Sequence, residues 1–533
     1  MKKQNFIKAS VILMASAVAA KVLGAVFKIP LTNMLGGVGM SYFGCAYSIF
    51  MPVYAFTVTG LSTAVAAMTA KSQAFGMYEN IRRIRRTALL LFSLVGIVGS
   101  LLIFLLSKPF SFISSGNGEA ALAVAVLAPS VLFGCVTAVE RGYYEGLGNM
   151  YPTAFSQLAE GIIRAAAGLW LCGYVSSNGE KLLEYFPFIT DIRALAAAAG
   201  IVGVTLSTLG GVVFFAVMRL FSGRKKTGGE AYIAKSGEIA RELVKTALPI
   251  GAGSVVTNLT AIIDMATIIG CIGFFGYSGA IPTGIAEADI PHFVYGSFSG
   301  IALTVFNLVP SVTNMLGKGA LSCTASAWAS GDKSELRRGT AQALLTAAVI
   351  AVPSAVGIGI LSPQILHILF ARQTDEAEIC IAALRCLMPG MVCLCMSFPV
   401  FAMLQGIGRA SAPLKIMLLG TAVKTVGNVV LIPFMGVCGA AVSTSLCYGV
   451  MLLTALGTYF KTAGISISPK PFAAVAYAGL LCGAAAYLGA DICGRAAGDI
   501  SSAIAATAAG GAVYLLSLYL LSVKVKRTKK ATA

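Results

Sequence analysis

The chain has 533 residues, of which 57% are hydrophobic and only 11% charged, and its formal net charge is +18. Soluble proteins carry roughly 45–50% apolar and about 25% charged residues, so this composition excludes a soluble globular protein. Long apolar segments without strict two-residue alternation indicate helices, because a helix satisfies its own backbone hydrogen bonds in lipid. The sequence therefore predicts an all-α polytopic membrane protein, and the excess of basic residues is attributed to membrane topology and not to nucleic acid.

About fourteen transmembrane helices are predicted in chain order, at about 20 residues per crossing. They span residues 6–30, 41–70, 87–107, 120–143, 152–175, 192–221, 243–275, 291–317, 339–361, 378–404, 411–432, 436–459, 470–489 and 500–523. Most of the 39 Lys and Arg residues then fall on the side of the N-terminus. Because Lys and Arg accumulate on the cytoplasmic side, both termini are predicted to be cytoplasmic and the number of helices to be even.

An internal repeat divides the chain. The sequence Glu145-Gly-Leu-Gly-Asn-Met-Tyr-Pro152 corresponds to Gln405-Gly-Ile-Gly-Arg-Ala-Ser-Ala-Pro413, and Arg82-Arg83 before one helix corresponds to Arg337-Arg338 before another. The copies lie about six helices apart, which gives them the same orientation and predicts two parallel six-helix lobes followed by two appended helices. The predicted domains are an N-terminal lobe (1–222), a basic cytoplasmic linker (223–242), a C-terminal lobe (243–460), and a final helix pair with a basic tail (461–533).

Several charged residues remain inside the predicted helices, where an ion is costly unless it meets water, a partner or a ligand. The cations are Lys21, Lys28, Arg164, Arg385 and Lys424, and the nearest acids are Glu160 and Asp264. At 1.5 Å per residue, Lys21, Arg164 and Lys424 lie roughly 18–22 Å from the cytoplasmic ends of their helices. The sequence thus predicts a cavity lined by cations that attracts a phosphate, pyrophosphate or carboxylate.

Structural interpretations stand beside this one. Lys28 and Arg385 lie near segment ends, where long basic side chains also reach the interface without a ligand. Glu160 and Arg164 are four residues apart, a spacing that also allows them to neutralise each other. Asp264 is interpreted either as the partner of a lysine or as a site for a coupling cation.

No pattern of residues indicates catalysis or a metal site. The two histidines, His292 and His367, stand alone, and no pair of cysteines has Cys-x-x-Cys spacing. No P-loop or nucleophile and base pattern occurs either. A transporter without a cofactor is predicted, driven by Na⁺, H⁺ or the membrane potential, or acting passively.

Three segments carry a family resemblance. They are Lys21-Val-Leu-Gly-Ala-Val-Phe-Lys-Ile-Pro-Leu-Thr-Asn-Met-Leu-Gly36, Glu145 to Glu160 followed by Arg164, and Gln405-Gly-Ile-Gly408 followed by Lys424 and Asn428. Together they resemble the stage V sporulation protein B and polysaccharide-exporter family of the multidrug/oligosaccharidyl-lipid/polysaccharide exporter superfamily.

The resemblance implies two lobes in a bacterial cytoplasmic membrane and alternating-access export or flipping of saccharides linked to undecaprenyl pyrophosphate, including peptidoglycan precursors. It also implies a central cavity lined by Lys21, Lys28, Arg164 and Lys424. The expected partners are this anionic lipid-linked substrate and membrane lipids, and the sequence indicates no oligomeric state. Two alternatives remain, a cation-coupled multidrug exporter and a non-transport membrane scaffold for envelope or spore assembly.

Overall fold

The fold is helical throughout the part of the chain that the computed structural model describes. That part comprises residues 6–116, 118–185, 189–221, 234–277, 279, 281–282, 285–314, 316–409 and 411–531. It contains helices joined by turns and no strand. Twelve of its helical segments are long and apolar enough to cross a membrane. The prediction of an all-α polytopic membrane protein is confirmed.

Two compact units divide the chain, Met1–Ala266 and Thr267–Ala533. The boundary lies inside α8 (Ser236–Phe275), which begins in the first unit. The predicted basic linker, 223–242, lies partly outside the described residues. The four predicted domain ranges remain a prediction.

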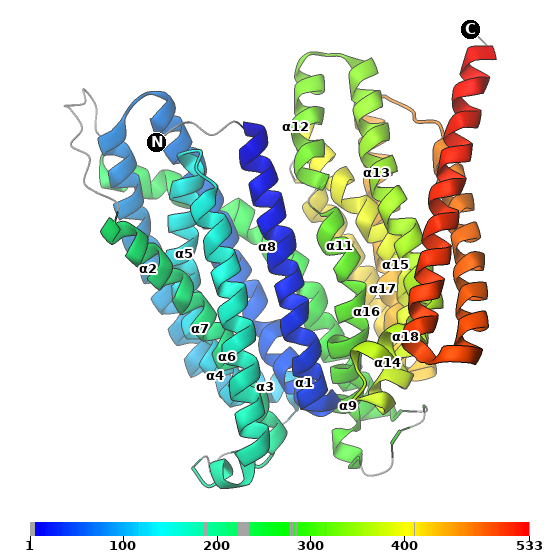
Figure 1. Cartoon of the computed structure of the whole chain (residues 1–533). Coiled ribbons are helices and arrows are strands. Elements are labelled where there is room, and N and C mark those ends of the chain that lie inside the picture. Colours follow the sequence, from blue (N-terminus) through cyan, green and yellow to red (C-terminus); the bar gives the residue numbers. More distant parts are fainter. Residues whose placement is uncertain are drawn as a thin grey trace. The chain divides into compact units, whose positions relative to one another are not determined.

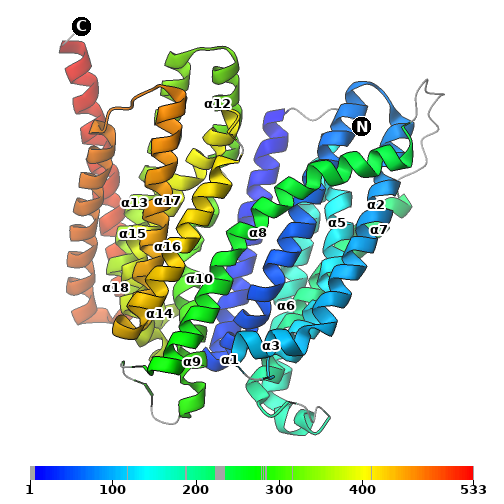
Figure 2. The ribbon, with the colours of Figure 1, turned by 180° about the vertical axis from the view of Figure 1, so that it is seen from behind.

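The first unit begins with α1 (Phe6–Ala74), which folds back on itself at Gly36. Gly36 has φ 64° and ψ −175°, a backbone conformation that glycine adopts readily and other residues only under strain. The rings of Phe27 and Phe43 lie 6.3 Å apart, whereas a straight helix would separate these residues by about 24 Å. Figures 1 and 2 show the two limbs running in opposite directions. The predicted helices 6–30 and 41–70 are therefore limbs of one hairpin, and a single glycine replaces the expected loop.

The other helices of the first unit pack around this hairpin. They are α2 (Tyr78–Leu105), α3 (Ser107–Ser115), α4 (Ala121–Leu127), α5 (Pro129–Gly146), α6 (Tyr151–Leu183), α7 (Ile192–Phe221) and the start of α8. Helices α5, α6 and α7 all contact α1, and α6 lies along α7. Phe27 from the first limb of α1 contacts Gly168 of α6, which fixes the first limb beside α6.

The second unit contains the end of α8, and a broken helical segment follows it. This segment consists of a 3₁₀ turn (Glu287–Asp289), α9 (Ile290–Ser297), the π-helical turn η2 (Phe298–Ala302), α10 (Leu303–Phe306), α11 (Leu308–Thr313) and α12 (Leu316–Ala329). Pro310 lies in the first turn of α11, where its missing N–H removes no helical hydrogen bond. The predicted helix over 291–317 is thus helical for most of its length, but the π turn and the break before α11 divide it.

The remaining helices of the second unit are longer. They are α13 (Lys333–Ile360), α14 (Ser362–Leu369), α15 (Thr374–Gly406), α16 (Ala412–Met435), α17 (Val437–Ala463) and α18 (Lys470–Ala531). Helix α18 is also a hairpin, since a Cβ on Gly489 would meet the Ala506 backbone and Ser502 Oγ donates to the Ala490 carbonyl at 3.0 Å. The limbs supply two candidate spans, Lys470–Ile492 and Ile500–Leu520, which match the predicted appended pair. Tyr514 donates to the Val349 carbonyl at 2.9 Å and ties α18 to α13.

The internal repeat is visible in the helix boundaries of each unit. Helices α2 and α13 have 28 residues each and are followed at once by the short helices α3 and α14. The turns α5–α6 and α15–α16 each contain a glycine with positive φ, Gly148 at 71° and Gly408 at 82°. A proline then occupies the first turn of both α6 and α16. The repeated sequence thus forms the same turn twice.

Candidate functional site

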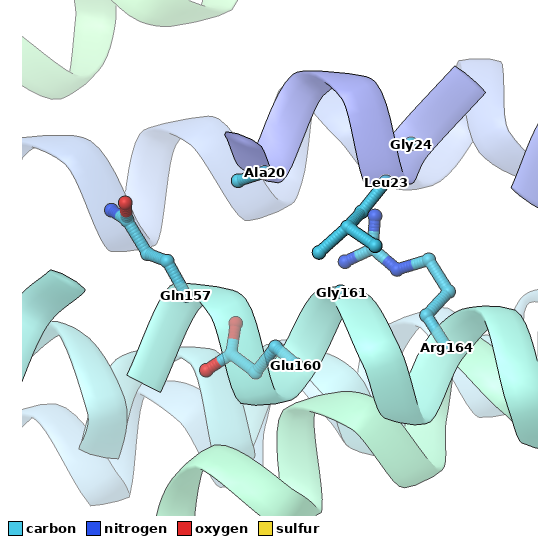
Figure 3. Close-up of a pocket in the computed structure, with 7 residues that line it drawn as sticks. All are labelled: Ala20, Leu23, Gly24, Gln157, Glu160, Gly161 and Arg164. Atoms are coloured by element: carbon cyan, nitrogen blue, oxygen red, sulfur yellow. The ribbon is translucent and has the colours of Figure 1, made fainter. Parts of the chain in front are cut away.

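A polar pocket of about 110 Å³ lies between α1 and α6 in the first unit (Figure 3). Its α6 wall is Gln157, Glu160, Gly161 and Arg164, and its α1 wall is Ala20, Leu23 and Gly24. These positions recur at intervals of three and four residues, so each set occupies one face of its helix. The residues on the α1 wall carry small or apolar side chains, and a Cβ on Gly24 would meet nothing within 4 Å. The polar groups of the pocket therefore come from α6.

Arg164 is the cation of this pocket. Its guanidinium extends toward Leu23 and Gly24 of α1 (Figure 3). Arg164 Nε is buried without a hydrogen-bond partner, and the side chain forms no ion pair in the described part of the chain. Gln157 Oε1, on the same wall, is also buried and unbonded there. Unsatisfied buried polar atoms are costly, so a donor and an acceptor left open beside a cavity indicate a place for a polar ligand.

Lys21 adds a second positive charge from α1. Its side chain is exposed and forms no ion pair or hydrogen bond within the described residues. It lies close enough to Arg164 for the two charges to repel each other. Two unpaired cations on facing helices raise the electrostatic potential of the space beside them, and an anion there would relieve their repulsion.

Glu160 does not neutralise Arg164. Its Oε1 accepts from Arg141 Nη2 of α5 at 2.7 Å, and Arg141 Nε also donates to Ser156 Oγ at 3.0 Å. The Glu160 carboxylate and the Arg164 guanidinium point apart (Figure 3). The interpretation that these two residues pair because they are four apart is wrong. Glu160 belongs to an interhelical pair with Arg141, so the positive charges of Lys21 and Arg164 stay uncompensated.

The sequence did not identify Arg141 or Gln157 as part of this region. Arg141 lies near the end of α5. Nothing local in the sequence marks Glu160 as its partner, because the two residues are on different helices. The spacing of Gln157, Glu160 and Arg164 on one helical face was the available signal for Gln157.

The remaining predicted residues lie outside the described pocket. Lys28 is half-buried on the first limb of α1, two residues before Pro30. Arg385 of α15 donates through Nε to the Gly359 carbonyl at 3.2 Å and to Ser362 Oγ at 3.0 Å. A cation at the carbonyl end of α13 stabilises that helix terminus, so the geometry of Arg385 is explained by packing between helices.

Lys424 and Asp264 are both buried, at 2% and 3% exposure. Lys424 lies on α16 about as far from the helix start as Arg164 lies on α6, in agreement with the repeat. One turn later Asn428 donates to Thr267 Oγ1 at 2.8 Å. Asp264 is on α8 in the first unit. Their roles in substrate or ion binding remain predictions.

A metal centre has no candidate ligands in the part of the chain that is described. No group of three or more His, Cys, Asp and Glu residues there is placed to hold a metal ion. His367 instead lies 2.9 Å from Glu378, in an exposed pair that joins α14 to α15.

Two family models each match more than half of the chain. The model described as lipid II flippase MurJ matches residues 190–496, and the model described as polysaccharide biosynthesis protein matches residues 6–277.

Curated relatives match most of the chain at low identity. Stage V sporulation protein B of Bacillus subtilis (strain 168) is 22% identical over 91% of this chain and 89% of its own length. Lipid II flippase MurJ of the same organism is 23% identical over 87% of this chain and 84% of its own length.

Solved structures share the fold. Lipid II flippase MurJ in an inward closed conformation matches with a TM-score of 0.69 and 14% identity, over 97% of this chain and 99% of that one. An inward-facing multidrug resistance MATE family transporter of the MOP superfamily matches with a TM-score of 0.62 and 16% identity, over 87% of this chain and 98% of that one. By the two family matches, each over more than half of its length, the chain belongs to the family of lipid II flippases and polysaccharide biosynthesis proteins.

Proposed function

We propose that this protein flips a lipid-linked saccharide precursor across the cytoplasmic membrane and that Lys21 and Arg164 bind its phosphate or pyrophosphate group. Family membership supports a lipid-linked precursor as the class of substrate. The observation that carries the proposal is the pair of unpaired cations on facing helices α1 and α6, beside a pocket in which Arg164 Nε and Gln157 Oε1 lack partners. The finer proposal is a saccharide on undecaprenyl pyrophosphate, such as a peptidoglycan precursor.

The physical problem in flipping is the head group, because the isoprenoid chain remains in lipid throughout. An ionised pyrophosphate needs compensating charge and hydrogen-bond donors at membrane depth. Arg164 offers a planar guanidinium that suits two phosphate oxygens, and Lys21 offers a compact charge with three donors. Because neither cation is neutralised by Glu160, both are available to the anion. Lys424 is included in the proposal on the sequence repeat alone.

A consistent topology and energy source complete the proposal. The distribution of Lys and Arg supports cytoplasmic termini. Movement of the head group is proposed to occur by alternating access, driven by Na⁺, H⁺ or the membrane potential or passively, with no cofactor. The protein acts as a transporter and not as an enzyme.

Export of cationic drugs is the second candidate, because MATE transporters share the fold. An organic cation would be repelled by Lys21 and Arg164, and the Glu160 carboxylate that could attract it is already paired with Arg141 at 2.7 Å. A scaffold without transport, the third candidate, would have no need for unpaired cations in and beside a pocket. The charge balance around α1 and α6 favours the flippase.

The test is flipping in proteoliposomes of a fluorescent sugar linked to undecaprenyl pyrophosphate, measured by its accessibility to a membrane-impermeant quencher. We expect Lys21→Gln and Arg164→Gln each to lower the initial rate roughly tenfold to a hundredfold, since a hydrogen bond to a charged group contributes about 1.5–3 kcal/mol. Lys461→Gln and Arg86→Gln, at exposed positions on α17 and α2, are the matched controls and should retain the wild-type rate.

Two results would contradict the proposal. One is flipping at the wild-type rate by both the Lys21→Gln and the Arg164→Gln variants while they remain folded. The other is transport of tetraphenylphosphonium, a permanent organic cation, without flipping of the lipid-linked sugar, which would favour the drug exporter.

A further inference from the structure

Five aromatic rings form a continuous row along α1, here called the aromatic ladder: Phe27, Phe43, Tyr47, Phe50 and Tyr54. Successive ring centroids lie 6.3, 4.9, 6.1 and 5.0 Å apart. The last four rings recur at intervals of four, three and four residues, so they share one face of the second limb. The ladder therefore begins at the contact between the limbs and follows the second limb away from Gly36.

The phenylalanines and tyrosines of the ladder differ in exposure. Phe27, Phe43 and Phe50 are 3–5% exposed, while Tyr47 and Tyr54 are only half-buried. Apolar packing explains the three buried rings. It does not explain why the two partly open positions carry hydroxyl groups, seven residues apart on the same face.

The hydroxyls of Tyr47 and Tyr54 have no hydrogen-bond partner among the described residues, and both side chains are partly exposed. Two other tyrosines of the chain are bonded. Tyr459 shares a hydrogen bond with Thr340 at 2.8 Å, and Tyr514 donates to the Val349 carbonyl at 2.9 Å. A partly buried tyrosine normally finds such a partner. The two ladder hydroxyls are therefore free donors.

Both free donors are within electrostatic range of Arg164, the cation of the pocket. Tyr54 is also within range of Glu160 and Arg141. The antiparallel contact of Phe27 with Phe43 places Tyr47 roughly opposite residues 23–24, which form the α1 wall of the pocket. The pocket wall and the ladder thus belong to adjoining parts of one hairpin.

The ring of Tyr54 is held in place by α5. A Cβ on Gly134 would collide with Tyr54 Cε2, and would also meet Val58 at 3.0 Å. On its other side the ring packs on Phe50, 5.0 Å away. A ring fixed from two sides presents its hydroxyl at a defined position, which reduces the entropy lost when a ligand binds.

We propose that Tyr47 and Tyr54 donate hydrogen bonds to the same phosphate or pyrophosphate that Lys21 and Arg164 attract. This inference rests on the proposed function and extends its site from two cations to a mixed set of donors. A tyrosine hydroxyl bonds strongly to an anionic oxygen without adding charge. It can therefore hold the head group firmly without strengthening the repulsion between the cations when the site is empty.

The test measures binding of farnesyl pyrophosphate to the full-length protein in detergent, with farnesol as the uncharged comparison. We expect Tyr47→Phe and Tyr54→Phe each to weaken binding about tenfold or more, because each removes only a hydroxyl that bonds to a charged group. Farnesol binding should be unchanged. Tyr174→Phe on α6, an exposed tyrosine that stacks on Trp170 at 6.0 Å, is the matched control and should bind as the wild type does.

A double-mutant cycle separates direct contact from altered packing. If Tyr47 and Arg164 bind one anion, Tyr47→Phe should cost much less in an Arg164→Gln background than in the wild type. Additive losses would contradict a shared ligand. Tyr47→Leu that weakens binding while Tyr47→Phe does not would show that only the ring matters, and would overturn the inference.

Failure of this inference is distinguishable from failure of the proposed function. Wild-type binding that falls with Arg164→Gln but is unaffected by both tyrosine to phenylalanine changes overturns the inference alone. If the wild type binds farnesyl pyrophosphate no better than farnesol, the anion site of the proposed function is itself overturned.

Discussion

Replacing Glu140 with glutamine is expected to lower the free energy of unfolding by about 3–5 kcal/mol, because it leaves Arg85 charged and unpaired between helices. Arg85 of α2 binds Glu140 of α5 through two parallel hydrogen bonds, of which Nε to Oε1 is 3.1 Å. The two side chains are only 16% and 6% exposed. The Arg85 guanidinium also lies 4.5 Å above the Tyr143 ring, so it cannot turn to solvent without losing that contact.

The measurement is thermal or denaturant unfolding of the purified protein in detergent. Glu79→Gln is the matched control, because Glu79 pairs with Arg82 on the same helix α2 at 3.3 Å but both side chains are more than 40% exposed. Exposed pairs contribute about 0–1 kcal/mol, so the control should unfold almost as the wild type does. Arg85→Met combined with Glu140→Leu should recover most of the loss, since it removes both charges. Equal effects of Glu140→Gln and Glu79→Gln would contradict the buried-pair explanation.

Replacing Gly203 with alanine is expected to destabilise the first unit by about 3 kcal/mol or more, at the upper end of the usual cost of overpacking. Gly203 of α7 faces Gly168 of α6, and a Cβ at position 203 would overlap the backbone of Gly168 and lie 3.2 Å from the Arg164 carbonyl. The obstacle is backbone and not a flexible side chain, so the two helices must move apart. Because α6 carries Arg164, flipping should fall together with stability.

Gly457→Ala on α17 is the matched control for that experiment. A Cβ at Gly457 would meet nothing within 4 Å, and alanine is the better helix former by about 1 kcal/mol. The control should therefore unfold at the same temperature as the wild type or at a higher one. If Gly203→Ala also leaves the unfolding temperature unchanged or raises it, the close backbone contact between Gly203 of α7 and Gly168 of α6 is contradicted.

Much of the helical architecture was predictable from the sequence, because long apolar segments and basic loops are local signals. The residues of α2, α5, α6, α7, α13, α15, α16 and α17 were anticipated, most of them with shifts at their ends. The short helix α14 was not predicted, and the repeat was recognised from the turns before Pro152 and Pro413. The errors have specific causes. The conformation of Gly36 and the π turn at Phe298–Ala302 depend on packing with distant segments, and hydropathy is insensitive to either.

The sequence predicted which type of residue forms the candidate site, but not which of these residues pair with each other. A basic residue inside a long apolar segment can be recognised from the sequence, so Lys21 and Arg164 could be selected by position alone. Helical spacing suggested that Glu160 would pair with Arg164. In the structure Glu160 pairs with Arg141 at 2.7 Å instead. The spacing rule considers only residues on one helix, so it takes no account of Arg141 on α5. The contact with Arg141 decides the direction of the Glu160 carboxylate.

The sequence by itself determined that this protein is an all-helical membrane protein with cations in its spans, because the free energy of burying backbone and charge in lipid depends mainly on composition and spacing. Tertiary structure alone decided which charges are free. Folding of α1 at Gly36 brings the first limb beside α6. Arg141 pairs with Glu160, so this carboxylate does not neutralise Arg164. The aromatic ladder places Tyr47 and Tyr54 within electrostatic range of Arg164. These outcomes depend on contacts between residues far apart in the chain, which no local pattern encodes.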